Sequence, residues 1–282
     1  MTKSRFVIIG DSSLDYSPEL NEWLQVVSVP LSVSIGEQVF VDDEQLDMEQ
    51  FLDILAQGSE VPKSAAPSPA AYLDAMQHAE EGVFIITLSS RLSGSYNSAM
   101  IAKQMAAEKY PELKVQVIDS LAASAGETTI AIKIRQCIDA GMGFEEIAAA
   151  AEDFRDHDKL YFLLDNIEVL VKNGRMSLLK GKLAMLLNIK PILGDDGNGS
   201  ICLEHKARSY TKALGLLARC FIETPLLTEG RTLVIAHCRA LAQATKLKEM
   251  IAALRKYKDI IIVPMKGLSS TYANICGLVC AC

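Results

Sequence analysis

The chain has 282 residues, of which 50% are hydrophobic and 6% aromatic, and a formal net charge of −7. This composition is typical of a globular protein with ample material for a core, in one large domain or two small ones. The acidic balance argues against broad binding to nucleic acid or to an anionic membrane, because both require a basic face.

No segment of the sequence resembles a signal peptide or a membrane span. The apolar run before Gly10 and Asp11 is too short for a signal peptide, and no stretch approaches the roughly 18 apolar residues of a spanning helix. We therefore expect a cytoplasmic protein without stable membrane insertion. Its seven cysteines lack metal-binding spacing and are expected to be reduced thiols, with no metal site.

The first half of the chain alternates strands and helices, with turn residues between them. Strands are expected at 6–9, 26–35, 83–88 and 115–118, and helices after Ser17, Asp47, Ser68, Ser93-Gly94 and Ser120. Pro30 indicates that the second strand is bent or lies at an edge, and the helix after Ser68 is expected to end near Gly82. This βαβ series predicts a parallel sheet with helices on both faces.

The segment from Ile86 to Ala99 is the most informative part of the sequence. It predicts a buried strand end, a hydroxyl-rich loop through Ser93 and Gly94, and a helix over 95–109. The first turn of that helix contains no Asp or Glu, which leaves its N–H groups free for an outside anion. An ordinary serine cap is the alternative, but we favour a functional role for Ser93 and Gly94.

Two further strand ends carry Asp or Ser, as Asp11-Ser12 and Asp119-Ser120. Ligands of open parallel sheets bind outside the carboxyl ends of the strands, so these groups are expected to face one crevice. Asp and Ser also terminate strands and cap helices, and both interpretations of Asp11 and Asp119 stay open.

The second half mixes strands and helices in an α+β pattern. After an acidic helix at 144–157 come a strand at 160–164, a helix with a capping box at 165–168, a helix at 178–187 and a hairpin over 189–204. Two helices around 212–222 and 241–256 then alternate with strands at 233–236 and 260–263. The hairpin predicts antiparallel pairing. We expect an N-terminal α/β domain, 1–158, and a C-terminal α+β domain, 159–282.

Several motifs resemble, in order, those of the DegV family. They are Asp11-Ser12, Pro30-Leu-Ser-Val33, Pro67-Ser-Pro69, Ser89-Ser-Arg-Leu-Ser-Gly-Ser-Tyr-Asn-Ser98, Ile118-Asp-Ser120, Asn173-Gly-Arg-Met-Ser177 and Leu187-Asn-Ile-Lys-Pro-Ile-Leu193. The resemblance covers essentially the whole chain and implies a two-domain fold that holds a long-chain fatty acid between its domains. It also implies that the protein presents the fatty acid's carboxylate to a separate kinase, without catalysis of its own and with no cofactor besides this ligand.

The resemblance implies a set of site residues. Ser93 and the Gly94 amide match the carboxylate-binding loop, and Ser64 stands where the family usually has a Thr. Many members have a His near the C-terminus that contacts the carboxylate. The matching segment here, 267–274, has none, so Ser270 or Tyr272 is expected to donate instead. Arg175 and Arg208 match basic positions that would meet a phosphate or an acidic kinase surface.

The remaining expectations concern the acyl chain and competing functions. The segment 178–187, with Met176 and Met185, is expected to line an apolar tunnel, although any single one of these residues is better explained by an ordinary core. A serine acyl hydrolase is the main alternative, but none of the four histidines sits in a catalytic motif. A nucleotide-dependent kinase is a second alternative, but this sequence contains no phosphate-binding loop of the kind that such kinases use.

Overall fold

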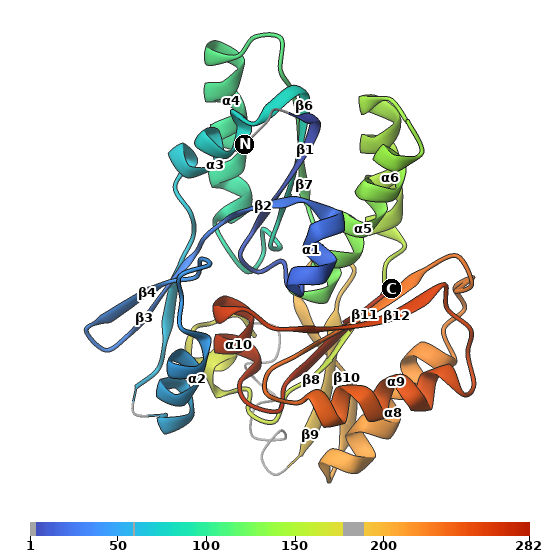
Figure 1. The fold of residues 1–282 in the computed structure, drawn as a ribbon. Helices are drawn as coiled ribbons and strands as arrows, with labels where there is room; N and C mark the ends of the chain where they lie inside the picture. Colours follow the sequence, from blue (N-terminus) through green and yellow to red (C-terminus); the bar gives the residue numbers. More distant parts are fainter. Residues whose placement is uncertain (1–3, 59, 177–188) are drawn as a thin grey trace.

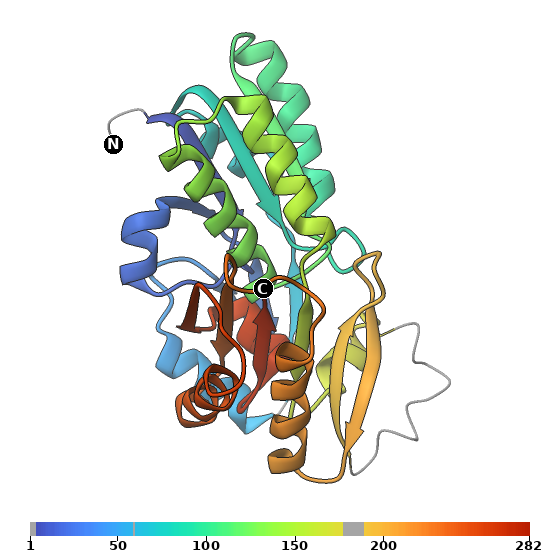
Figure 2. The same ribbon diagram turned by 90° about the vertical axis from the view of Figure 1, so that its right-hand side faces the viewer.

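Two large sheets, one above the other, and one small sheet form the framework of the molecule (Figures 1 and 2). The computed structural model describes residues 4–58, 60–176 and 189–282. Strand pairings within the four-stranded and three-stranded sheets use only residues before Asp158, and those of the six-stranded sheet use only residues after it. The helix expected at 178–187 lies outside the described residues.

The four-stranded sheet is parallel throughout, as the βαβ pattern predicts. Its strand order is β2-β1-β6-β7, with β1 Ser4–Asp11, β2 Val26–Val29, β6 Ala79–Thr87 and β7 Lys114–Asp119. Val7 and Ile9 of β1 pack with α3 Pro69–Met76 and α4 Ser95–Lys109. Phe6 and Ile8 point the other way, into a core shared with α1 Pro18–Leu24, α5 Ala125–Asp139 and α6 Phe144–Asp156. Helices on both faces therefore bury the apolar runs of these strands.

The second strand expected from the sequence is two strands in two different sheets. Pro30 ends β2, the edge strand of the parallel sheet, and the chain then enters β3 Ser32–Ile35. β3 pairs antiparallel with β4 Gln38–Val41 and β5 Lys63–Ala65, a small sheet that the sequence pattern did not predict. α2 Met48–Gln57 begins and ends as expected, because Asp47 accepts the Gln50 N–H at 3.0 Å and Gly58 adopts a φ of +61°.

The six-stranded sheet mixes parallel and antiparallel neighbours in the order β10-β9-β8-β13-β11-β12. Its strands are β8 Leu160–Leu163, β9 Lys190–Asp195, β10 Ile201–Ala207, β11 Thr232–His237, β12 Asp259–Pro264 and β13 Leu278–Ala281. The expected hairpin is the antiparallel pair β9–β10. α8 Tyr210–Ile222 and α9 Leu241–Ala252 cover one face of the sheet, and the opposite face looks toward the parallel sheet (Figure 1).

Two helix boundaries differ from the prediction. α3 ends at Met76, not near Gly82, because the chain enters β6 at Ala79; Gly82 is part of that strand, where an added Cβ would lie 2.5 Å from the Phe144 ring. α7 Glu168–Lys172 has no capping box. Its Glu168 N–H donates to Asn166 Oδ1 at 2.7 Å, whereas Asp165 pairs with Lys190.

Two helices connect the sheets. α5, of the first half, packs on β11 and β13, and α10 Gly267–Ala273, near the C-terminus, packs on α2 and β3. The division of the chain at Asp158 stays a prediction, although the sheet pairings respect it. Among the described residues, no helix combines the length and apolarity that crossing a membrane requires.

Candidate functional site

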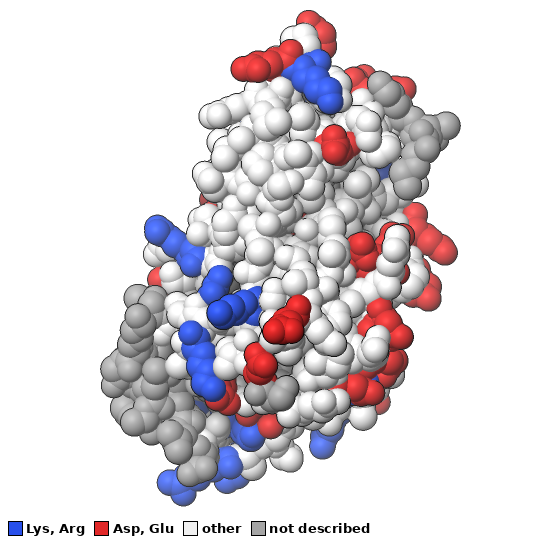
Figure 3. Space-filling model, turned by 90° about the vertical axis from the view of Figure 1, so that its left-hand side faces the viewer, with Lys and Arg blue, Asp and Glu red and all other residues white. Residues whose placement is uncertain are grey.

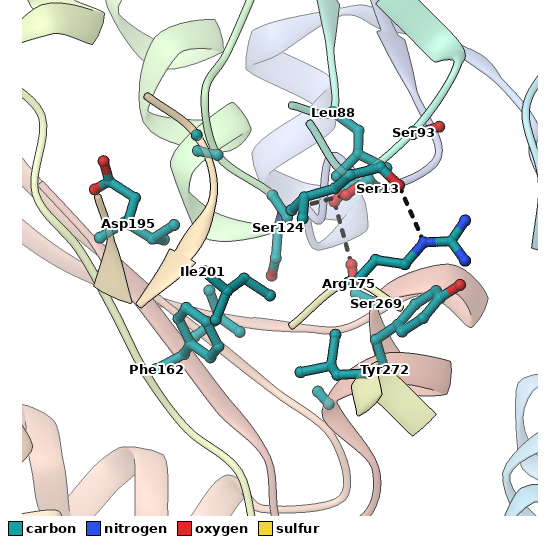
Figure 4. Close-up of a pocket in the computed structure, with 18 of the residues that line it drawn as sticks. Ser13, Leu88, Ser93, Ser124, Phe162, Arg175, Asp195, Ile201, Ser269 and Tyr272 are labelled. Carbon is teal, nitrogen blue, oxygen red and sulfur yellow. Dashed lines mark hydrogen bonds between the residues drawn. The ribbon is translucent and has the colours of Figure 1, made fainter. Parts of the chain in front are cut away.

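A pocket lies between the two large sheets. Most of its lining is apolar and comes from both halves of the chain: Leu88, Leu92 and Leu121 from the loops after β6 and β7, Leu160, Phe162 and Val279 from the six-stranded sheet. At one end lie Ser93, Arg175 and Tyr272 (Figure 4). The pocket thus has an apolar length and one end with a cation and several hydroxyl groups, the usual design of a site that orients an amphipathic ligand.

The loop with Ser93 follows β6 and leads directly into α4, as the sequence predicts. The Ser93 hydroxyl oxygen accepts the Ser95 N–H at 3.2 Å and lies 3.1 Å from the Ser95 hydroxyl oxygen. Gly94 is the N-cap without a capping side chain, and the first turn of α4 contains no acid. Gly94 itself is exposed and is not part of the pocket wall.

Ser64 and Tyr272 meet across 208 positions of sequence at the polar end of the pocket. Their hydroxyl oxygens are 2.8 Å apart, joining β5 to α10. Either oxygen is able to donate in this pair, which leaves one hydroxyl proton for a third acceptor.

Arg175 extends along the pocket toward the Ser93 loop (Figure 4). Its Nε donates to the Leu92 carbonyl at 3.2 Å and its Nη1 to the Asn173 carbonyl at 2.7 Å. The guanidinium carbon lies 6.0 Å from the centre of the Tyr272 ring. These contacts fix the positive charge beside Ser93 and Tyr272, and the remaining N–H groups of the guanidinium can still donate to a ligand.

Besides Gly94, two other expected residues do not line the pocket. Ser270 is fully buried, and its hydroxyl donates to the Met265 carbonyl at 3.4 Å. α10 turns by about 100° per residue, so Ser269 and Tyr272, three positions apart, share the pocket face while Ser270 points away. Arg208 is exposed in the connection between β10 and α8, outside the pocket wall.

Sequence reasoning missed four serines that line the pocket: Ser13, Ser124, Ser200 and Ser269. The Ser269 hydroxyl donates to the Ser13 carbonyl at 3.2 Å, and the Ser124 N–H donates to the Ser13 hydroxyl at 3.3 Å. Ser13 belongs to the hydroxyl-rich strand end that the sequence marked. No sequence motif marks Ser124, whose backbone adopts a φ of +57° in the folded chain.

Asp11 and Asp119 shape the loops and do not face the pocket. Asp11 accepts the N–H groups of Leu88, at 2.9 Å, and of Ser13, at 3.1 Å. Asp119 accepts those of Ser90, at 3.0 Å, and Leu121, at 3.2 Å. Neither belongs to the pocket wall, so the structure favours the loop-forming interpretation for both.

The hydrolase alternative requires a base beside the serine. Within the described ranges, none of the four histidines lines the pocket that contains Ser93. Of the residues expected to form an apolar tunnel, Met176 is buried in the core next to the pocket, while 178–187 with Met185 lies outside the described residues.

Comparisons with known proteins agree with this architecture. A family model described as "Uncharacterised protein, DegV family" matches residues 5–279. A DegV domain-containing protein of Streptococcus pneumoniae is 37% identical over 275 residues, 96% of each chain.

Two solved structures show the same fold over nearly their full length. A DegV family protein of Ruminococcus gnavus, refined with vaccenic acid, has a TM-score of 0.93 at 35% identity, with 99% of each chain covered. The fatty acid kinase (Fak) B3 protein of Streptococcus pneumoniae, loaded with linoleic acid, has a TM-score of 0.88 at 35% identity, covering 100% of this chain and 99% of that one.

Proposed function

Because the chain belongs to the DegV family, we propose that it is a fatty-acid-binding protein that holds one long-chain fatty acid in the pocket between its two large sheets. The observation that carries the proposal is the division of this pocket into an apolar length and a polar end with Arg175. A fatty acid has the same division, a long hydrocarbon tail and one anionic head group. The related structures solved with vaccenic and linoleic acid support it.

The apolar length of the pocket supplies most of the affinity. Burying a tail of about fifteen methylenes is worth roughly 12 kcal/mol at about 0.8 kcal/mol each, before the costs of ordering the ligand reduce it. Phe162 and Ile201 lie at the end away from Ser93, on the same side as Asp195 (Figure 4), so the tail runs toward the six-stranded sheet.

The polar end holds the carboxylate and thereby fixes the direction of the ligand. Ser93, Ser64, Tyr272 and the Gly94 amide donate hydrogen bonds, and Arg175 adds a positive charge. Hydrogen bonds to an ionised group are shorter and stronger than neutral ones, which suits a site that must recognise one anionic head. Ser270 is not part of this set, since its hydroxyl faces Met265.

The partner of the protein is proposed to be a fatty-acid kinase that receives the carboxylate. The similar Fak B3 protein supports this assignment by its name. On the face drawn in Figure 3, Lys and Arg side chains gather at the left of the lower half, beside Asp and Glu side chains that gather at its centre and right. On a chain of net charge −7, a local group of Lys and Arg side chains favours contact with a phosphate or an acidic surface. Arg175 and the exposed Arg208 are candidates for such a contact.

Native mass spectrometry of the purified chain tests the proposed function directly. We expect an added mass of one long-chain fatty acid per chain, lost on delipidation and regained on addition of oleate or palmitate. A chain that carries no lipid and takes none up, but hydrolyses a nitrophenyl ester, would refute the proposal and favour the serine hydrolase.

A further inference from the structure

The β9–β10 hairpin forms the wall of the pocket on the side away from Ser93. Asp195, at the end of β9, and Ile201, at the start of β10, line the pocket and lie opposite Ser93 (Figure 4). The turn between the two strands, residues 196–200, contributes Gly199 to the same wall. We call residues 196–200 the hairpin turn. An acyl chain whose head group lies at Ser93 therefore runs toward the hairpin turn.

Hydrogen bonds within the hairpin turn hold its backbone in a defined conformation. Asp195 Oδ1 accepts the Gly197 N–H at 2.6 Å. Asp196 Oδ1 accepts the N–H groups of Asn198 and Ser200, each at 3.0 Å, and the Asp196 N–H donates to the Ser200 carbonyl at 2.9 Å. Because the hairpin turn is fixed internally, its distance from the opposite wall depends on the contacts that it makes outside itself.

Gly199 is the residue through which the hairpin turn contacts the first half of the chain. The buried Ser89 hydroxyl, in the loop after β6, donates to the Gly199 carbonyl at 2.8 Å and accepts the Arg91 N–H at 3.2 Å. A Cβ atom added to Gly199 would lie 2.4 Å from Ser89 Oγ and 3.0 Å from the Cα of Leu121, in the loop after β7. Both distances are shorter than ordinary van der Waals contact, and the second is to backbone. Only a residue without a side chain therefore lets the hairpin turn approach these loops so closely.

The pocket wall changes in chemistry where it reaches the hairpin turn. Phe162 and Val279 give the middle of the pocket an apolar surface, whereas the polar residues Asp195 and Ser200 line it beside the hairpin turn. A methylene group gains free energy when it is buried against apolar side chains. A methylene group that lies against polar groups removes water from them and offers no hydrogen bond in return, which is unfavourable. The gain from lengthening the acyl chain should therefore stop abruptly at the hairpin turn.

We propose that the hairpin turn sets the longest acyl chain that the pocket accepts, and that Gly199 is the specificity-determining residue for this limit. The inference rests on the proposed function and adds to it the feature of the ligand that the site selects, the length of the tail. Gly199 acts by allowing the hairpin turn to dock directly on Ser89 and on the Leu121 backbone. A side chain at this position moves the hairpin turn away from these loops and lengthens the space for the tail.

The affinities of delipidated protein for saturated fatty acids of 10 to 20 carbons test this, measured by displacement of a fluorescent fatty acid. In wild type, the affinity should rise by up to about fourfold per added methylene and stop rising at a limiting length. In Gly199→Ala, we expect the limit to move to a longer acid. The acid two carbons beyond the wild-type limit should gain several-fold, and at most about fifteenfold, in affinity relative to the acid at the limit.

Two further variants separate the position of the wall from backbone strain. Gly197→Ala is the matched control, because Gly197 has a φ of +81°, next to +80° for Gly199, but an added Cβ would meet no atom within 4 Å. It carries the same strain as Gly199→Ala, so it should keep the wild-type limit. Leu121→Ala opens the same end of the pocket without changing the hairpin turn, because Leu121 Cδ2 lies 3.3 Å from the position of the added Gly199 Cβ. It should move the limit to a longer acid.

The outcomes distinguish the inference from the proposed function. An unchanged limit in both Gly199→Ala and Leu121→Ala, or an equal shift in Gly197→Ala, would overturn the inference, as would a wild-type affinity that rises without a limit across the series. Fatty-acid binding itself would stand in each of these cases. If Gly199→Ala fails to fold, Leu121→Ala decides by the same criterion. A wild-type protein that binds no acid of the series would refute the proposed function and the inference with it.

Discussion

At the scale of single residues, the head-group end of the pocket depends on hydroxyl groups from distant parts of the chain. Ser93 comes with a local signal, since it lies between a buried strand and a helix whose first turn lacks acids. Ser64 and Tyr272 act as a pair, because their hydroxyl oxygens lie 2.8 Å apart and this contact joins β5 to α10. The same helix shows how one position decides the role of a side chain: Ser269 faces the pocket, and Ser270 donates to the Met265 carbonyl.

Replacing Ser93 by Ala should weaken fatty-acid binding by about 10- to 100-fold, because a hydrogen bond to a charged group contributes about 1.5–3 kcal/mol. Displacement of a fluorescent fatty acid measures the change. Ser90→Ala is the matched control: Ser90 is exposed on the same loop and uses its N–H, not its hydroxyl, to contact Asp119. Equal affinity of the two variants would show that the Ser93 hydroxyl does not bind the head group.

At the scale of elements, β13 shows how a strand lines a pocket on one face only. Val279 and Ala281 belong to the core on the pocket side, and Leu278 and Cys280 belong to the core with α8 and α9. This alternation follows from the period of two residues in a strand. β13 lies in the middle of the six-stranded sheet, between β8 and β11, so its pocket-facing positions are held rigidly.

Replacing Val279 by Phe should shorten the space available to the acyl chain, because the larger ring enters the pocket from a fixed strand. We expect the affinity for palmitate to fall at least several-fold more than that for decanoate. Overpacking in the surrounding core is expected to cost about 1–3 kcal/mol of stability. Cys280→Ala, on the other face of β13, serves as the control: it should lower stability without changing the preference for chain length. An equal loss for both ligands in the Val279 variant would contradict the proposed path of the tail.

At the scale of the whole molecule, two acids with little access to water lie where the two halves meet. Asp15, near the N-terminus, accepts the Lys266 N–H and the Ser124 hydroxyl, at 2.7 and 2.6 Å. Asp158, where the chain passes between the large sheets, accepts the Thr129 hydroxyl at 2.8 Å, while its second oxygen has no partner. Burial raises the pKa of Asp158 to about 7. Asp15 thus joins the two halves through Lys266, and the charge of both acids is poorly solvated near neutral pH.

The stability of the protein should therefore fall as pH rises from about 4 to about 7. Asp158 has a pKa of about 7 in the folded chain against an ordinary value of 3.8, so the folded state binds more protons in this window. Each such acid contributes a loss of at most about 1.4 kcal/mol per pH unit. In Asp158→Asn, the difference in the free energy of unfolding between pH 5 and pH 8 should be smaller than in wild type, as measured by urea denaturation. An unchanged difference would show that Asp158 is not held protonated.

The sequence by itself determined the local elements and the loop that approaches the ligand. The parallel sheet, the β9–β10 hairpin and the start of α4 at Ser95 all follow from short-range signals, namely apolar runs, caps and turn residues. The helix start after Asp47 and its end at Gly58 follow from capping in the same way. Such signals are sufficient because they act within a few residues of the chain.

Only the tertiary structure decided which side chains meet. The small sheet pairs β3, which falls in the strand expected at 26–35, with β4 and β5, which no sequence pattern predicted. The Ser64–Tyr272 contact depends on how α10 docks against this sheet. Ser124 and Ser269 are brought to one pocket from separate elements by packing. The physical reason is that burial and hydrogen-bond partners are properties of the packed chain, fixed by long-range contacts that no local pattern encodes.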